Sequence, residues 1–161
     1  MAVDNGAVYN NGGYNFGQRN ARECIIYNMD TKQVLKCQFN PEDLPRTRSV
    51  NYANIVSPGM AYPLVQFVNG EAEDMDINLT FYNDSDTNKL KAYENFLESL
   101  LPPKNNKPDF KRPTTIKFYY GNKVVVDTYV VTKKQITKEY LNSNGDPYYR
   151  TYTLSVRRVM H

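Results

Sequence analysis

The clearest pattern in the chain is a strict alternation of apolar and polar residues over positions 73–82. The apolar members are Met75, Ile77, Leu79 and Phe81, and the polar ones between them include Asp74, Asp76, Asn78 and Thr80. Successive side chains of a β-strand point to opposite faces of its sheet. The pattern therefore predicts a strand with one buried face and one face that is wet or in contact with a partner.

A helical period follows this strand. Apolar side chains recur at three- and four-residue intervals, which draws one apolar stripe along an amphipathic helix. They are Leu90, Tyr93, Leu97, Leu100 and Leu101. Asp84, Ser85 and Asp86 are candidate N-caps with favourable negative charge, and Pro102 and Pro103 end the helix. A single such helix among strands must cover a sheet face or a barrel mouth.

Shorter β-rich runs bounded by turn residues fill the rest of the chain. They predict strands near 24–27, 34–39, 48–56, 64–68, 115–120, 123–141 and 148–159. The first two form a hairpin around Asp30 and Thr31, and the last two form another through the tight-turn pair Asn144 and Gly145. On the last strand Tyr152, Leu154 and Val156 share one face, and Thr151, Thr153, Ser155 and Arg157 share the other.

These elements predict a mostly β fold with one α-helix, in a single domain over residues 23–161. Residues 1–22 precede it as an arm that is rich in Asn, Gly and Tyr and has no period. Alone, such a segment cannot bury enough surface to offset the entropy lost when it is ordered. We therefore expect neighbouring subunits to hold it.

The composition is that of a globular protein, with 161 residues, 40% of them hydrophobic, and 14 tyrosines. No apolar run approaches the roughly 18 residues of a membrane crossing, and the N-terminus lacks the layout of a secretory signal. The net charge of +3 is scattered, which does not favour a dedicated duplex binder. We expect a soluble protein made in a reducing cytoplasm, with Cys24 and Cys37 as reduced, small apolar side chains.

Residues suited to catalysis or to metal binding are scarce. The one histidine is the terminal His161, so Ser-His-Asp and Cys-His machinery is excluded. Two cysteines do not supply a structural zinc site, and no glycine-rich phosphate loop opens a helix. The acidic residues at 71–76 are typical of a polar sheet face rather than of a calcium loop or a glycosidase pair. We predict that the protein is not an enzyme and holds no cofactor or metal.

Tyrosines gather in the C-terminal strands, at 119–120, 148–149 and 152. Side chains with a large apolar body and a polar end are enriched at protein interfaces, although cross-strand packing accounts for some of them. Two functions stay open on this ground. One is subunit contact in an assembly, and the other is a monomeric β-sandwich module that binds carbohydrate or single-stranded nucleic acid on aromatic platforms.

A series of motifs in a fixed order resembles the tube-domain family of contractile injection systems. A strand exit carries Gln38, Phe39, Asn40, Pro41 and Glu42, a later segment carries Leu64, Phe67, Gly70 and Glu71, and a turn before the last strand carries Gly145, Pro147 and Arg150. The resemblance covers roughly residues 24–159. The order and spacing of the motifs carry it, since no single motif is very specific.

The resemblance implies a tail-tube-like β-barrel or sandwich that joins with its neighbours into a ring. In this family six copies merge their sheets into one inner barrel around a channel. The members that this chain resembles initiate the tube between the central spike hub and the tail tube, and many carry a C-terminal LysM module. The chain ends at His161, directly after the last predicted strand, so we expect it to lack that module.

We therefore expect a structural component of a contractile phage tail or related injection particle, a hexameric tube or tube-initiator ring. Its expected partners are copies of itself, the tail tube protein, and spike hub and baseplate proteins. Assembly would take place in the bacterial cytoplasm and end in the virion tail, with no membrane partner and with nucleic acid only as cargo. Asp74, Asp76, Asn78 and Thr80 are expected to face the channel or a neighbouring subunit.

Overall fold

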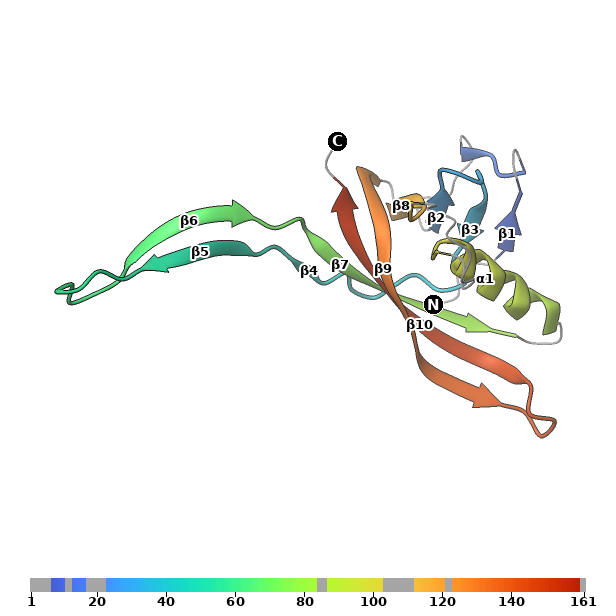
Figure 1. The fold of residues 1–161 in the computed structure, drawn as a ribbon. Coiled ribbons are helices and arrows are strands. Elements are labelled where there is room, and N and C mark those ends of the chain that lie inside the picture. Colours follow the sequence, from blue (N-terminus) through green and yellow to red (C-terminus); the bar gives the residue numbers. More distant parts are fainter. Residues whose placement is uncertain are drawn as a thin grey trace.

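A computed structural model shows a twisted β-sheet with one helix packed against it and a long hairpin that projects from it (Figure 1). The structure describes residues 7–10, 13–16, 23–83, 87–102, 112–120 and 123–159. The elements are β1 (Ala7–Tyr9), β2 (Cys24–Asn28), β3 (Val34–Lys36), β4 (Arg46–Thr47), β5 (Val50–Ile55), β6 (Leu64–Gly70), β7 (Asp74–Tyr82), α1 (Thr87–Ser99), β8 (Thr115–Tyr120), β9 (Lys123–Leu141) and β10 (Pro147–Val159). The predicted fold class, mostly β with one helix, is confirmed.

Eight of these strands form one antiparallel sheet in the order β1-β3-β2-β8-β9-β10-β7-β4, and β5 and β6 form a two-stranded sheet of their own. The two sheets are connected by a nearly continuous ladder, because β4 leads into β5 and β6 leads into β7. The amide of Glu71 donates to the carbonyl of Ser49 at 2.9 Å in the gap between them. One bent hairpin over residues 46–82 thus belongs partly to the body and partly to the projection.

The predicted hairpin near the N-terminus is confirmed as β2 and β3. Asn28 shapes its turn, since its side-chain oxygen accepts hydrogen bonds from the amides of Asp30 and Thr31 at 3.0 and 3.1 Å. On its other side β3 pairs with β1, in the register Val8 opposite Leu35. Residues 7–9 of the predicted arm are therefore paired with a strand of their own chain, and the expectation that neighbouring subunits hold the arm stays a prediction.

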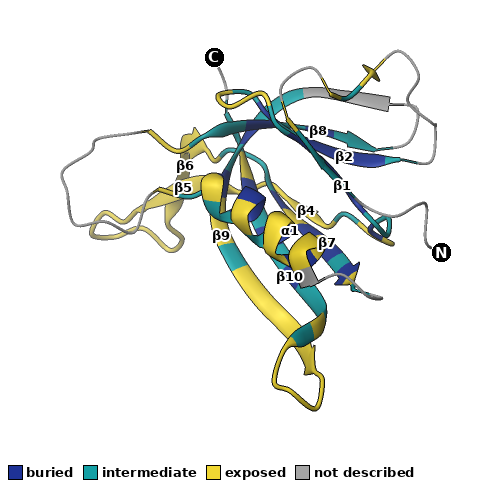
Figure 2. Cartoon of the chain, turned by 90° about the vertical axis from the view of Figure 1, so that its right-hand side faces the viewer, coloured by how far each residue is buried: buried dark blue, intermediate teal, exposed yellow. Residues whose placement is uncertain are grey.

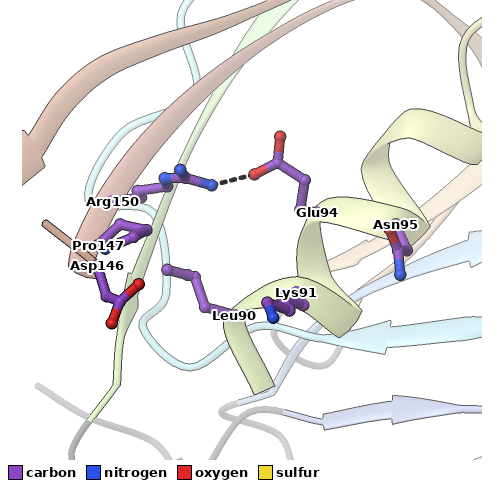
Figure 3. A pocket seen from close by; sticks show the side chains of 7 residues that line it. All are labelled: Leu90, Lys91, Glu94, Asn95, Asp146, Pro147 and Arg150. Carbon is purple, nitrogen blue, oxygen red and sulfur yellow. Dashed lines mark hydrogen bonds and ion pairs between the residues drawn. The ribbon is translucent and has the colours of Figure 1, made fainter. Parts of the chain in front are cut away.

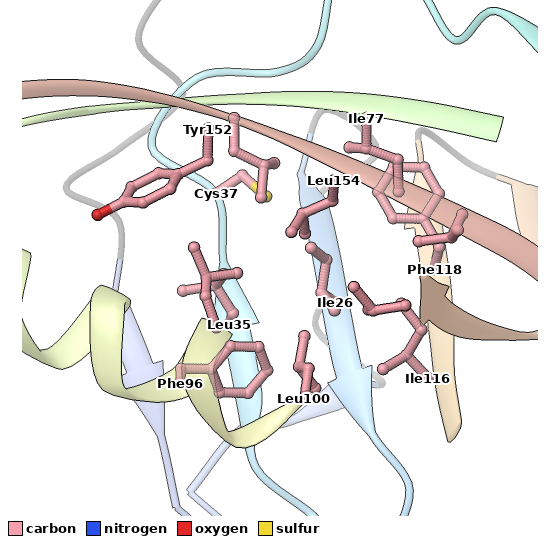
Figure 4. Packing of buried hydrophobic residues seen from close by; sticks show 14 of the residues in the cluster. Ile26, Leu35, Cys37, Ile77, Phe96, Leu100, Ile116, Phe118, Tyr152 and Leu154 are labelled. Carbon is pink, nitrogen blue, oxygen red and sulfur yellow. The ribbon is translucent and has the colours of Figure 1, made fainter. Parts of the chain in front are cut away.

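The core lies where the sheet curls over itself and α1 closes the space (Figure 4). The four apolar residues of the alternating strand are buried, as are Tyr152, Leu154 and Val156 of β10. They pack against Ile26 and Leu35 from the opposite part of the sheet. Burial of each large apolar side chain contributes about 1.5–3 kcal/mol, so this shared core holds the two parts of the sheet together.

Helix α1 packs on the core through the predicted stripe. Leu90, Tyr93, Leu97 and Leu100 are buried, together with Phe96, whereas the opposite side of the helix is exposed (Figure 2). The candidate N-caps at 84–86 lie outside the described residues. The chain tightens after the helix, where the amide of Leu100 donates to the carbonyl of Leu97 at 3.3 Å, a spacing typical of a terminal turn.

The two cysteines are free and buried in the core. The amide of Cys37 donates to the carbonyl of Cys24 at 2.9 Å, so the two residues lie side by side on neighbouring chain segments. Burial, and next the proximity of Cys37, raise the pKa of Cys24 well above its ordinary value. The Cys24 thiol therefore stays protonated and unreactive at neutral pH.

The projecting hairpin is the main feature that the strand pattern did not predict. Every residue of β5 and β6 is exposed, on both faces of the two-stranded sheet (Figure 2). The predicted strands at 48–56 and 64–68 do exist, but they extend away from the body instead of packing on its core (Figure 1). We call residues 50–70 the β5–β6 arm.

Candidate functional site

The four β7 residues that we expected to face a channel or a neighbour lie on the face of the sheet opposite the core. Asp76 and Asn78 are exposed, and Asp74 and Thr80 are half-buried. Each side chain is hydrogen-bonded to the residue opposite it on β10. The pairs are Asp74–Arg157, Asp76–Ser155, Asn78–Thr153 and Thr80–Thr151. Their donor–acceptor distances run from 2.6 Å at Asp76 to 3.2 Å at Thr80, so the polar groups of this face largely satisfy one another.

The pair Asp74–Arg157 adds an ion pair to this row. Nε and Nη2 of Arg157 lie 2.7 and 3.0 Å from the two carboxylate oxygens, which is a two-pronged contact. The hydrogen bond from Arg157 lowers the pKa of Asp74, against a smaller opposing effect of desolvation. The same contact raises the pKa of Arg157. The carboxylate is thus held charged, and its charge is neutralised locally.

Strand β9 adds basic and amide side chains to the same face. Lys133, Gln135 and Lys138 lie opposite Ser155, Thr153 and Thr151 of β10. The register shifts by one residue at Thr132 and again at Thr137, which marks two β-bulges. The hydroxyls of these threonines donate to the carbonyls of Ser155 and Thr151 at 3.0 and 3.1 Å. A bulge bends its strand and increases the local twist, so β9 bends at these two points.

A hollow of about 560 Å³ lies on this polar face, bordered by the loop that follows β3. The motif residues Phe39, Asn40, Pro41 and Glu42 line one side of it. Its aromatic side chains are Phe39 and Tyr149, among polar residues of β7, β9 and β10. A module that binds carbohydrate or single strands needs a row of stacking platforms, so the geometry does not favour that alternative.

A second hollow, also of about 560 Å³, lies between α1 and the end of the β9–β10 hairpin (Figure 3). On one side of it, Glu94 pairs with Arg150 and accepts a hydrogen bond from the hydroxyl of Tyr152 at 2.7 Å. Lys134 lies 3.7 Å from the same carboxylate and pairs with Glu98. Burial raises the pKa of Tyr152, which therefore stays protonated. The charges of this cluster are mutually neutralised, and its role is to fasten the helix to the sheet.

The remaining motif residues shape strand ends, a turn and the arm. The side-chain oxygen of Gln38 accepts a hydrogen bond from the amide of Tyr82 at 2.7 Å and so covers the outer edge of β7 at its end. Glu71 accepts one from the side chain of Asn51 at 3.1 Å, across the base of the arm. Leu64, Phe67 and Gly70 lie on β6, Gly145 lies in the β9–β10 turn, and Pro147 begins β10.

Two stretches of strand edge have no partner strand among the described residues. Strand β8 pairs with β9 only up to Val130, so the outer side of residues 131–141 is open. At the far side of the sheet stands β4, which is two residues long. Beyond it, the amide of Asp76 donates to the carbonyl of Pro45 and the amide of Tyr82 donates to the side chain of Gln38, and no described strand pairs with the outer edge of β7. Open edges of this kind present backbone donors and acceptors to another chain.

A comparison of the sequence with models of protein families identifies the family of this chain. The model of contractile injection system tube proteins matches residues 25–158, which is most of the chain. The chain belongs to this family. No protein in a set of curated proteins matches it. Among solved structures, a chain in the "virion of native gene transfer agent (GTA) particle" is similar, with 9% identity, a TM-score of 0.38, and an alignment that covers 89% of this chain and 95% of that one.

Membership of the tube family confirms the resemblance that the motifs predicted. The protein is a structural component of a contractile injection particle, and its family is one of structural tube proteins rather than of known enzymes. Within the described part of the chain, no group of three His, Cys, Asp or Glu side chains could hold a metal ion. No helix in that part is long and apolar enough to cross a membrane.

Sequence reasoning about this tube protein missed the exposed surface of the β5–β6 arm. The sequence pattern predicted strands near 48–56 and 64–68 without assigning their side chains to a core or a surface, and in the structure Tyr52, Tyr62 and Phe67 are 60%, 84% and 60% exposed. One signal in the sequence could have indicated this, because no charged residue stands between Arg48 and Glu71. A strand with a solvated face normally carries charged residues on that face, so their absence points to a partner surface on both faces.

Proposed function

We propose that copies of this tube protein join side by side into a closed ring of six and form a tube or tube-initiator ring between the spike hub and the tail tube. Family membership supports the tube component. The observation that supports the ring is the open edge of β9 over residues 131–141. The short edge strand β4 lies at the other end of the strand order β9-β10-β7-β4. A sheet with an open edge at each side joins to further copies edge to edge, and rotation closes the series.

The two open edges belong to different surfaces of the molecule, so the contact is heterologous. In the order β9-β10-β7-β4, neighbouring strands are antiparallel. Strand β4 therefore runs opposite to β9, and the β9 edge of one copy meets the β4 edge of the next in the antiparallel sense. This arrangement continues the antiparallel pattern of the sheet around the whole ring. The bulges at Thr132 and Thr137 supply the bend that closure requires.

The polar face of β7, β10 and β9 lines the channel in this proposal. The other face is covered by the core and α1, so the helix lies toward the outside of the ring. Asp74, Asp76, Asn78 and Thr80 then stand on the channel wall, where their pairing with β10 leaves few free polar groups to retain nucleic acid or another cargo. Assembly takes place in the bacterial cytoplasm before the ring enters the particle.

Proline substitutions in β9 test the lateral contact. Alternate amides of a strand point to opposite edges, so one of Gln135→Pro and Ile136→Pro removes an outward amide and the other breaks the ladder to β10. The variant that keeps the melting temperature of the unchanged protein is the outward one, since proline is tolerated at an open edge. We expect this variant to lose the ring in mass photometry. If this variant forms rings as stable as those of the unchanged protein, the edge-to-edge contact through β9 is wrong.

Gold labelling of assembled rings tests the channel wall. A maleimide–gold cluster attached through Asn78→Cys should lie on the inner rim in negative-stain averages. The matched variant Asn95→Cys, on the exposed side of α1, should place the gold on the outer rim. The opposite placement would contradict the assignment of β7 to the channel, and it would leave the ring itself standing.

A further inference from the structure

Cys24 and Cys37 form a matched pair of thiols in the core. Ile25 of β2 is paired with Lys36 of β3, and the next position outward on each chain is a cysteine. The amide of Cys37 donates to the carbonyl of Cys24 at 2.9 Å, so the two residues stand opposite each other as a hydrogen-bonded pair of an antiparallel ladder. In such a pair the Cα atoms are about 5.5 Å apart.

The spacing and the direction of the two side chains suit a disulfide. Disulfides join residues whose Cα atoms lie about 4.4–6.8 Å apart and whose side chains point toward each other. Both cysteines belong to the same buried cluster, into which Cys37 points in Figure 4. Their side chains lie within hydrogen-bonding reach of each other. The folded hairpin therefore already holds the two sulfurs at a spacing that one covalent bond can bridge.

The thiols are shielded as long as the β2–β3 hairpin is closed. Cys24 and Cys37 are 0% and 1% exposed. Strand β2 is held between β3 and β8, whereas the outer side of β3 pairs with only the three residues of β1. Short pairing at an edge favours local opening, so β3 is the strand that can detach. Once it detaches, both thiols meet water, where the reactive thiolate forms.

We propose that Cys24 and Cys37 are a redox-sensitive fastener, a free dithiol in a reducing environment and an internal disulfide in an oxidising one, which closes through local opening of the β2–β3 hairpin. The pair stays reduced in the cytoplasm, where the proposed ring assembles, and closes when the particle meets a small-molecule disulfide such as oxidised glutathione. This setting rests on the proposed function, whereas the bridge itself is a property of the single chain.

The bridge forms by two steps of thiol–disulfide exchange. The thiolate of one cysteine attacks a sulfur of oxidised glutathione, a mixed disulfide forms, and one glutathione thiolate leaves. The thiolate of the other cysteine then attacks the protein sulfur of the mixed disulfide, the internal S–S bond forms, and the second glutathione thiolate leaves. The two cysteines lose two electrons and two protons, and one oxidised glutathione becomes two molecules of the reduced form.

The bridge fastens the segment that reaches the outer edge of β7. Gln38 directly follows the pair, and its side chain accepts a hydrogen bond from the amide of Tyr82 at 2.7 Å. Three residues further on, the carbonyl of Pro41 accepts one from the hydroxyl of Tyr120 on β8 at 3.0 Å. A covalent bond at the start of this segment therefore ties the β7 side of the sheet to β2 and β8, around the shared core.

Mass measurement and thermal unfolding test the bridge on the free chain. After incubation with oxidised glutathione, the intact mass should fall by two hydrogen atoms, and peptide mapping without reductant should link Cys24 to Cys37. Closing a loop of this length constrains the unfolded chain, so the melting temperature should rise by about 5–10 °C. Dithiothreitol should reverse both changes. Cys24→Ala and Cys37→Ala are the controls, which should stop at the mixed disulfide and show no rise.

Two matched turn variants test whether this hairpin admits the oxidant. Asn28→Ala removes the two hydrogen bonds that the side chain accepts in the β2–β3 turn, so it should speed bridge formation about tenfold. Asn142→Ala removes the same arrangement from the β9–β10 turn, where the side chain accepts from the amides of Asn144 and Asp146. It should lower the melting temperature and leave the rate of bridge formation unchanged.

The outcomes separate this proposal from the ring. If the unchanged protein keeps both thiols, stops at the mixed disulfide, or forms bridges only between chains, the pair is not a fastener. Equal acceleration by the two turn variants would mean that the bridge needs global unfolding, which overturns the local opening. The measurements use unassembled chains, so they give the same result in the β9 proline variant that forms no rings. A missing bridge, in turn, leaves the ring standing.

Discussion

The β9–β10 turn depends on one glycine with a positive φ angle. Gly145 has φ +83° in the β9–β10 turn, and a Cβ there would meet no atom within 4 Å. Gly145→Ala should therefore destabilise the fold only through backbone strain, by about 1–2 kcal/mol. Gly70→Ala is the matched control, because its site is equally open and its φ is not positive. Equal melting temperatures for the two alanine variants would contradict this reading.

The ion pair on the polar face predicts a pH dependence. The pKa of Asp74 is lowered in the folded state, so its contribution to stability is present above the unfolded pKa of about 3.9 and is lost as the pH falls through the folded value. Asp74→Asn should lower the melting temperature at neutral pH by a few degrees at most, since both side chains are about half exposed. The difference from the unchanged protein should shrink as the pH falls below the unfolded pKa and vanish once the pH is below the folded pKa of Asp74.

The partner variant serves as the control for this prediction. Arg157→Gln should reproduce the pH profile of Asp74→Asn, and the double variant should lose little more than either single one. A difference that persists at low pH would show that Asp74 stabilises the fold by another route.

At the scale of whole elements, a phenylalanine contributes much more to the stability of the single chain in the body than in the arm. Phe81 on β7 is fully buried, and Phe81→Ala should cost about 3–5 kcal/mol of unfolding free energy. Phe67 on β6 is 60% exposed, and Phe67→Ala should leave the stability of the single chain within about 0.5 kcal/mol. Urea unfolding of dilute protein measures both. A large loss for Phe67→Ala in a monomer would mean that the arm packs on the body.

The sequence predicted those elements in which local pattern and tertiary packing agree. The alternation in β7 assigned Met75 and Leu79 to a buried face, the helical stripe included Leu97, and the alternation in β10 placed Leu154 on one face with Tyr152 and Val156, and all of them are buried. Strand β1 was missed because three residues in an Asn- and Gly-rich segment show no period. The two bulges in β9 were missed because each inserted threonine shifts the alternation by one residue, which no single-strand pattern reveals.

The candidate site was predicted in part for the same reason. Alternation placed Asp74, Asp76, Asn78 and Thr80 together on one face, and the structure adds the β10 side chains that bond to them. The apolar residues alone did not reveal the exposure of the arm, because apolar β-branched residues favour a strand whether its cover is its own core or another chain. The absence of charged residues between Arg48 and Glu71 is the signal that distinguishes the two cases.

At the scale of the whole molecule, the described part of the chain has an unpaired strand edge and an exposed apolar hairpin, which are typical of a subunit of an assembly. A core and a helix hold the sheet, while the β9 edge and the β5–β6 arm have no cover among the described residues. A monomer with these features is an aggregation hazard, and the proposed ring would pair the β9 edge with β4 of the next copy.

The most direct test of this account is negative-stain imaging with mass photometry, on the protein alone and then mixed with the spike hub and tail tube proteins of its particle. The account predicts six-fold rings, in the protein alone or after addition of the hub, which stack onto the hub or the tube. A strict monomer under both conditions would contradict it.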